Sequence, residues 1–103
     1  MEEGRKDTLN KLNWSLLPFD ALIEVAEVFE IGPVKYGGSR TWLPGISYSK
    51  LFSAIIRHLV SWFYYREEMD RESGKRHLAH IAANALMLLG CKDNKDFDDR
   101  PKQ

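Results

Sequence analysis

The sequence has a single cysteine, Cys91, among its 103 residues. One cysteine cannot form a disulfide within the chain or supply a cysteine-based zinc site. Because chains without disulfides are typical of reducing compartments, we expect a cytosolic protein. An excess of charge of either sign is also absent, since Lys and Arg together number 15 and Asp and Glu together number 15. Net charge therefore gives no reason to expect a long nucleic acid as partner.

Long apolar segments are absent as well. The N-terminal run MEEGRKDTLNKLNW has no apolar core of the kind that a signal peptide needs. The uncharged runs elsewhere are short and are interrupted by polar residues, so none is expected to span a bilayer. We therefore expect a cytoplasmic location and no membrane partner.

Strand patterns and internal repeats are missing too, and the apolar periodicity is helical. In FDALIEVAEVFEI the apolar residues recur at helical spacing, with Pro18 before the segment and Gly32-Pro33 after it as boundaries. Two longer apolar segments follow. The predicted fold is all-α, with helices at about 19–31, 49–66 and 75–89.

The polar ends of the chain set the expected domain organisation. Residues 1–13 are predicted to form a flexible N-terminal arm, and residues 14–90 a single helical domain. The tail 91–103 is charged and almost without large apolar groups, so it is predicted to be disordered.

The apolar surface of these helices exceeds what one small protomer can cover. The helices 49–66 and 75–89 are hydrophobic around most of their circumference, which indicates burial on several sides. Trp14, Leu16 and Leu17 are expected to dock on the body as well. We therefore predict a homo-oligomer, a dimer or tetramer, in which the long helices pair as a helical bundle.

Two acidic pairs are the first candidate site residues. Glu24 and Glu27 share one face of the first helix with Asp20, where like charges repel unless a cation joins them. Glu67 and Asp70 follow the second helix, where the helix dipole disfavours anions. Carboxylate oxygens are the ligands that Mg²⁺ prefers, so these four acids are candidate metal ligands.

Each acidic pair also has a purely structural interpretation. The first pair fits a solvated helix face. The second fits an ion-pair network with Lys75 and Arg76, and Asp70 or Ser73 fits the cap of the third helix.

The polar groups on the apolar helices form the second candidate set. His77, His80 and Asn84 project from one side of the third helix, and each must be hydrogen-bonded or cost about 1–3 kcal/mol. We expect them to bond acids, or a bound base and ribose, rather than a metal. On the second helix, a buried Arg57 beside His58 needs an anion, which a phosphate or the carboxylate of Glu24 or Glu27 would supply.

The loop PVKYGGSRTWLPGIS, residues 33–47, is long for a structureless connection, which indicates function. Lys35 and Arg40 suit phosphate, and Tyr36 and Trp42 suit a stacked base. The spacing of a phosphate-binding P-loop is absent.

Taken in chain order, these segments resemble the sequence pattern of a known protein family. The N-terminal half carries SLLP at 15–18 and ALIEVAEVFEIG-x-x-KYG at 21–37. The C-terminal half carries Arg57-His58-Leu59, then E-x-x-D-x-ESG and HLAHIAANALMLL. This pattern is similar to the phage-associated helical domain called dATP/dGTP diphosphohydrolase, N-terminal, which resembles the MazG-like all-α nucleotide pyrophosphohydrolases.

The resemblance implies a nucleotide-handling oligomer in the host cell cytoplasm. It implies a Mg²⁺-dependent enzyme, with Mn²⁺ as a possible substitute, that cleaves (deoxy)nucleoside triphosphates to the monophosphate and pyrophosphate. The catalytic residues implied are Glu24, Glu27 and Asp70, and the metal ligands implied are Glu24, Glu27, Glu67 and Asp70. The nucleotide-binding residues implied are Lys35, Tyr36, Arg40, Trp42, Arg57, His58, His77, His80 and Asn84.

Two other hypotheses fit the same residues. One is a non-catalytic, anti-defence sponge that sequesters a host immune nucleotide signal. The other is a structural or regulatory oligomer in which the polar groups only specify packing.

Overall fold

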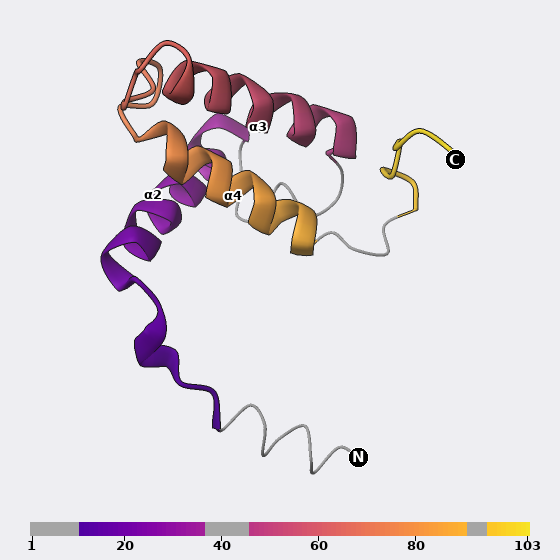
Figure 1. Ribbon diagram of the computed structural model, residues 1–103. Coiled ribbons are helices and arrows are strands. Elements are labelled where there is room, and N and C mark those ends of the chain that lie inside the picture. The colour runs from indigo at the N-terminus through magenta and orange to yellow at the C-terminus, as the bar shows by residue number, and fades with distance from the viewer. Residues whose placement is uncertain (1–10, 37–45, 91–94) are drawn as a thin grey trace.

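The computed structural model describes residues 11–36, 46–90 and 95–103. This part of the chain contains one short 3-10 turn and three α-helices, which are η1 Trp14–Leu16, α2 Phe19–Tyr36, α3 Tyr48–Phe63 and α4 His77–Gly90 (Figure 1). It contains no strand, and its one β-type contact is an isolated bridge between Met69 and Arg76. The predicted all-α class is confirmed. None of these helices combines the length and the apolarity that crossing a membrane requires.

The helix α4 is central, because it packs against both α2 and α3. The helices α3 and α4 run side by side in opposite directions, and α2 crosses α4 (Figure 1). Val25 and Val28 of α2 are buried against Ala79 and Ala83 of α4, as the apolar spacing in α2 predicts. The alanines have no side chain beyond Cβ, so the two helices approach closely.

The boundaries of α2 match the prediction at one end only. The helix begins directly after Pro18, whose carbonyl accepts a hydrogen bond from the Leu22 N–H at 3.0 Å. It then continues through Gly32 and Pro33 to Tyr36, so the prediction that this pair ends the helix is wrong. A proline removes only the one helical hydrogen bond that its own N–H would donate, and three residues follow Pro33 before α2 ends, so the helix continues past it.

The helix α3 ends at Phe63, before the predicted boundary at residue 66. The N–H groups of Tyr64 and Tyr65 both donate to the Val60 carbonyl, at 2.9 and 3.2 Å, and Arg66 has a φ of 59°. A left-handed residue reverses the chain direction and stops the helix. Glu67 and Asp70 therefore lie in the connection to α4.

That connection is a tight turn that returns toward its own start. The Asp70 N–H donates to the Lys75 carbonyl at 2.7 Å, and the Gly74 N–H donates to the Asp70 carbonyl at 2.8 Å. The His77 N–H then donates to the Glu68 carbonyl at 2.9 Å. Helix α4 consequently begins at His77, later than the predicted residue 75.

Residues 95–103 belong to the segment 91–103 that is predicted to be disordered, and in the structure they contact the start of α3. The Tyr48 N–H donates to the Phe97 carbonyl at 2.9 Å, and the Ser49 N–H donates to Asp99 Oδ1 at 2.8 Å. The first N–H groups of a helix have no partner within the helix, and the Ser47 side chain supplies no capping bond here. The tail thus caps α3.

The apolar residues before α2 do not dock on the body. Trp14 is 55%, Leu16 80% and Leu17 40% exposed, so the predicted docking is wrong for this protomer. The reason is geometric: η1 leads away from the place where α2 meets α4, as Figure 1 shows.

Candidate functional site

Three histidines meet between α3 and α4. His58 comes from the last turns of α3, and His77 and His80 come from the first turn of α4. The Nδ1 atoms of His58 and His77 lie 2.8 Å apart, and the rings of His58 and His80 stack at 4.5 Å with an angle of 6°. We call these residues the histidine cluster. The antiparallel pairing of α3 and α4 brings its members together.

The contact between His58 and His77 restricts their protonation. Burial first, and then the neighbouring His80, lower the pKa of His58, while Asp70 opposes the shift, and the resulting pKa is about 4. His58 is therefore neutral at pH 7. Two facing ring nitrogens at 2.8 Å need one proton between them, so one Nδ1 donates and the other accepts.

The other ring nitrogen of His77 lacks a hydrogen bond. Its side chain is 5% exposed, and Nε2 is buried without a hydrogen-bond partner. A carboxylate oxygen of Glu67 lies 3.5 Å from this nitrogen, which is an electrostatic contact but not a hydrogen bond. A buried polar atom without a hydrogen bond is rare in proteins and calls for an explanation.

Asp70 connects the turn to the histidine cluster through Ser73. Asp70 Oδ2 accepts hydrogen bonds from the Ser73 N–H at 3.1 Å and the Ser73 hydroxyl at 2.8 Å. Ser73 Oγ also lies 2.7 Å from His80 Nε2. Because a hydroxyl has one proton, and Asp70 takes it, His80 Nε2 must be the donor to Ser73.

The turn also keeps Asp70 ionised. Burial by itself would raise the pKa of Asp70, but the two hydrogen bonds from Ser73 and the nearby His80 and His58 outweigh it and lower the pKa. The side chain is 21% exposed, and its Oδ2 lies 3.5 Å from His80 Nε2. Asp70 therefore supplies a negative charge at the edge of three imidazole rings.

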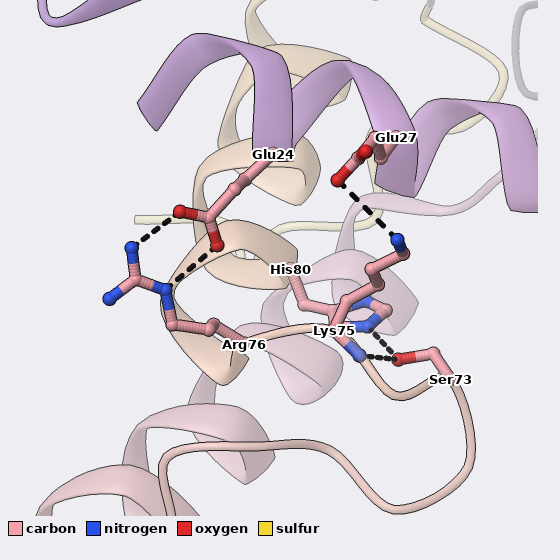
Figure 2. Close-up of polar contacts among 6 residues, drawn as sticks. All are labelled: Glu24, Glu27, Ser73, Lys75, Arg76 and His80. Carbon is pink, nitrogen blue, oxygen red and sulfur yellow. Dashed lines mark hydrogen bonds and ion pairs between the residues drawn. The ribbon is translucent and has the colours of Figure 1, made fainter. Parts of the chain in front are cut away.

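The acidic pair of α2 faces basic residues of the turn (Figure 2). Both Arg76 Nε and Arg76 Nη2 donate to the Glu24 carboxylate, Nε at 2.8 Å, and Lys75 Nζ lies 3.4 Å from Glu27 Oε1. The hydrogen bond from Arg76 lowers the pKa of Glu24, and the same bond raises the pKa of Arg76. Lys75 and Arg76 are thus partners of the first acidic pair, whereas the sequence suggested them for the second.

The four predicted metal ligands are divided between two places. Glu24 and Glu27 hold Arg76 and Lys75, whereas Glu67 and Asp70 lie beside His77 and His80. Over the described ranges, one set of three potential metal ligands has its ligand atoms within 4.8 Å of one another, and its members are His58, Asp70 and His77. The geometry thus joins the second acidic pair to the histidines.

The other predicted site residues either lie apart from this set or fall outside the residues that the structure describes. Arg57 is exposed on α3, so the expected burial is wrong, and Glu24, its suggested partner, is bound by Arg76. Asn84 is half-buried on α4. Lys35 and Tyr36 lie at the end of α2, and Arg40 and Trp42 fall outside the described residues.

Sequence reasoning missed two links. One is Ser73, which joins Asp70 to His80, and the other is the direct contact of His58 with His77. A signal existed for the second, because a histidine near the end of one apolar helix and another at the start of the next face each other once the helices pair antiparallel.

Comparisons with known proteins agree on one family. Residues 1–100 match the family described as dATP/dGTP diphosphohydrolase, N-terminal. The chain is also similar to a protein of Salmonella phage PMBT28 named dATP/dGTP diphosphohydrolase, with 32% identity over 76 residues. That match covers 74% of this chain but 25% of the relative, so the chain spans about a quarter of the relative's length. No solved structure matches the chain significantly.

Proposed function

The chain belongs to the dATP/dGTP diphosphohydrolase, N-terminal family, and on this basis we propose that it cleaves (deoxy)nucleoside triphosphates to the monophosphate and pyrophosphate with Mg²⁺ or Mn²⁺. The observation that carries the proposal is the pairing of Glu24 with Arg76 and of Glu27 with Lys75 across the interface of α2 and the turn. A metal–triphosphate complex needs carboxylates for the metal and cationic side chains for the phosphates. Here the carboxylates and the cations face one another.

The pairing suggests how a nucleotide would bind. Phosphate oxygens suit Arg76 and Lys75, and the carboxylates they release suit a hard divalent cation. Glu24 and Glu27 fit Mg²⁺ by ligand type, and the bound ion would neutralise phosphate charge and favour ionisation of water. Exchange of partners is feasible because the four side chains are 30–50% exposed, and exposed ion pairs are weak.

Pyrophosphate release in Mg²⁺ tests this proposal. The full chain should release pyrophosphate from dATP or dGTP, and Glu24→Gln and Asp70→Asn should each lose release by at least about 100-fold, the usual effect of a positioned acid or base. Glu30→Gln is the matched control, because Glu30 is an exposed acid on the same helix whose loss should leave the rate unchanged. Failure of the wild type to turn over any nucleotide in Mg²⁺ or Mn²⁺ would contradict the proposal.

One observation favours a second candidate function, binding without turnover. Arg76 and Lys75 place two cationic side chains on the same side of α2, and such groups bind phosphate oxygens through their own charge without a metal. This sponge for a host immune nucleotide signal predicts tight binding in the presence of a chelator. Calorimetry followed by chromatography of the same sample distinguishes the two, because a sponge returns its ligand intact.

The apolar surface supports the proposal of a homo-oligomer, a dimer or tetramer. One side of α3 carries an unbroken apolar stripe at helical spacing, each member at least 36% exposed, made of Phe52, Ile56, Leu59, Val60 and Phe63. Helix α4 carries a second stripe, made of Leu78, Leu86 and Leu89. A second copy of the chain is the occupant we propose, since its own stripes are complementary in length and apolarity.

A further inference from the structure

We propose that His58, His77 and Asp70 form a binding site for a transition-metal ion of the zinc class, separate in ligand type from the carboxylate site on α2. The three ligand atoms lie within 4.8 Å of one another, and they come from α3, α4 and the turn between them. This inference does not depend on nucleotide cleavage.

The facing nitrogens of His58 and His77 are the first support. Their Nδ1 atoms lie 2.8 Å apart, with one proton between them, and loss of that proton or its transfer to the other ring nitrogen leaves two nitrogen lone pairs at one place. A tetrahedral ion with nitrogen ligands at about 2.0–2.1 Å holds those nitrogens about 3.3 Å apart. A small opening of the pair would thus let a metal take the place of the proton.

The orphaned nitrogen of His77 is the second and independent support. His77 Nε2 is buried without a hydrogen bond and lies 3.5 Å from a carboxylate oxygen of Glu67. A metal-bound histidine commonly donates its other N–H to a carboxylate, which orients the ring. When Nδ1 binds a metal, the ring proton resides on Nε2, and a small approach of the Glu67 carboxylate, now at 3.5 Å, would form the hydrogen bond from that N–H.

The surrounding groups orient the other two ligands. His80 stacks on His58 at 4.5 Å, and Ser73 holds one oxygen of Asp70 while bonding His80. A carboxylate has two oxygens, so Ser73 keeps its bond when the other oxygen binds a metal. His80 and Ser73 are positioning residues in this scheme.

The ligand types decide the class of metal. Imidazole suits Zn²⁺, Fe²⁺, Co²⁺ and Ni²⁺, whereas Mg²⁺ takes oxygen ligands and keeps its waters. Two imidazoles and one carboxylate are also a known catalytic zinc set, which leaves a fourth position open. Water or an oxygen of a phosphate ester is the group that this open position would take.

Co²⁺ is the probe that tests the site, because its visible absorption reports its coordination. The full chain, freed of metal with a chelator and kept without nucleotide, should bind one Co²⁺ per chain with the intense bands of a low-coordinate ion. Zn²⁺ should displace it, and excess Mg²⁺ should not. Asp70→Asn and His58→Gln should each weaken binding at least about tenfold.

The controls show whether weaker Co²⁺ binding comes from loss of a ligand, from loss of a negative charge or from misfolding. Glu68→Gln removes one exposed acid from the same turn and should bind Co²⁺ normally. Asp70→Asn retains an oxygen that can accept the Ser73 bonds, and far-ultraviolet circular dichroism checks the helices of each variant. Nitrogen NMR of the wild type adds a test without mutation, since Zn²⁺ should shift the Nδ1 signals of His58 and His77.

The proposal is overturned by any of three results. These are normal Co²⁺ affinity in both ligand variants, equal weakening in Glu68→Gln, and displacement by Mg²⁺ as effective as by Zn²⁺. Because no nucleotide is present, such a result would leave the proposed pyrophosphate release standing, and absent release would leave this site standing.

Discussion

Two residues of the connection between α3 and α4 adopt the left-handed backbone conformation, and they determine its path. Arg66 has a φ of 59° and Gly74 a φ of 73°. A residue with a Cβ pays about 1–2 kcal/mol for this conformation, whereas glycine pays almost nothing. Arg66 ends α3, and Gly74 closes the turn that holds Asp70 beside the histidine cluster. Backbone conformation at single residues thus places the candidate metal ligand.

Gly74→Ala should therefore lower the free energy of unfolding by about 1 kcal/mol. Steric overlap does not contribute, because no atom lies within 4 Å of the position that an added Cβ would take. Arg66→Gly is the counterpart. Glycine relieves the backbone strain at the positive φ of residue 66, but it also gives the unfolded chain more conformational freedom, which folding must remove. The two effects oppose one another, so the free energy of unfolding should change by no more than about 0.5 kcal/mol. Urea unfolding followed by circular dichroism measures both. Equal stability of Gly74→Ala and wild type would contradict the argument.

At the level of elements, the start of α3 depends on a segment far away in the chain. Ser49 donates both its N–H and its hydroxyl to the Asp99 carboxylate, which lies 50 residues later. An acceptor at a helix N-terminus satisfies a free N–H, and a negative charge there also suits the helix dipole. A neighbouring acid, Asp98, instead pairs with Arg100. Asp99 is thus the capping acid, supplied by the tail.

This cap should weaken in acid. The hydrogen bonds from the Ser49 side chain and backbone lower the pKa of Asp99, so its contribution to folding is complete above the ordinary aspartate pKa, about 3.9, and is lost as the pH falls through the lowered value. The Ser49 amide NMR signal should titrate below that ordinary value. The titration should vanish in Asp99→Ala and persist in Asp98→Ala. An unchanged titration in Asp99→Ala would show that the tail does not cap α3.

For the whole molecule, the main physical problem is apolar surface left uncovered. Only five apolar side chains are buried in the described part of the protomer, which are Val25, Val28, Leu51, Ala79 and Ala83. By contrast, Phe63 is 77% and Leu89 68% exposed. Patches of this kind mark association surfaces in proteins. The buried core of one protomer is thus small, and assembly would enlarge it.

A charge within the α3 stripe should therefore dissociate the proposed oligomer. Ile56 lies in the middle of the stripe, and Ile56→Lys would bury an unpaired ammonium in the interface, so the variant should sediment as a monomer. Lys50→Glu is the control, because Lys50 is an exposed residue of the same helix outside the stripe, and this variant should assemble like the wild type. A wild type that sediments as a stable monomer at micromolar concentration would contradict the prediction.

Much of the helical framework could be predicted from local sequence. Apolar spacing identified α2 and its buried Val25 and Val28, and it identified α3 and α4 to within a few residues. The errors lie at helix ends, at Pro33 and at Phe63, where a few backbone hydrogen bonds decide the boundary. Such bonds depend on the turn that follows, which periodicity does not describe.

The residues of the candidate site could be predicted from the sequence, but the way in which their side chains pair could not. The sequence by itself determined an all-α chain, its family, and the presence of acids and histidines on or beside apolar helices. Only the tertiary structure decided their partners, since Glu24 meets Arg76 at a separation of 52 residues and His58 meets His77 at a separation of 19. Helix formation depends on neighbours a few residues apart, which a sequence pattern records. Side-chain pairing depends on how α2, α3 and α4 cross, and the packing of the whole chain sets those crossings.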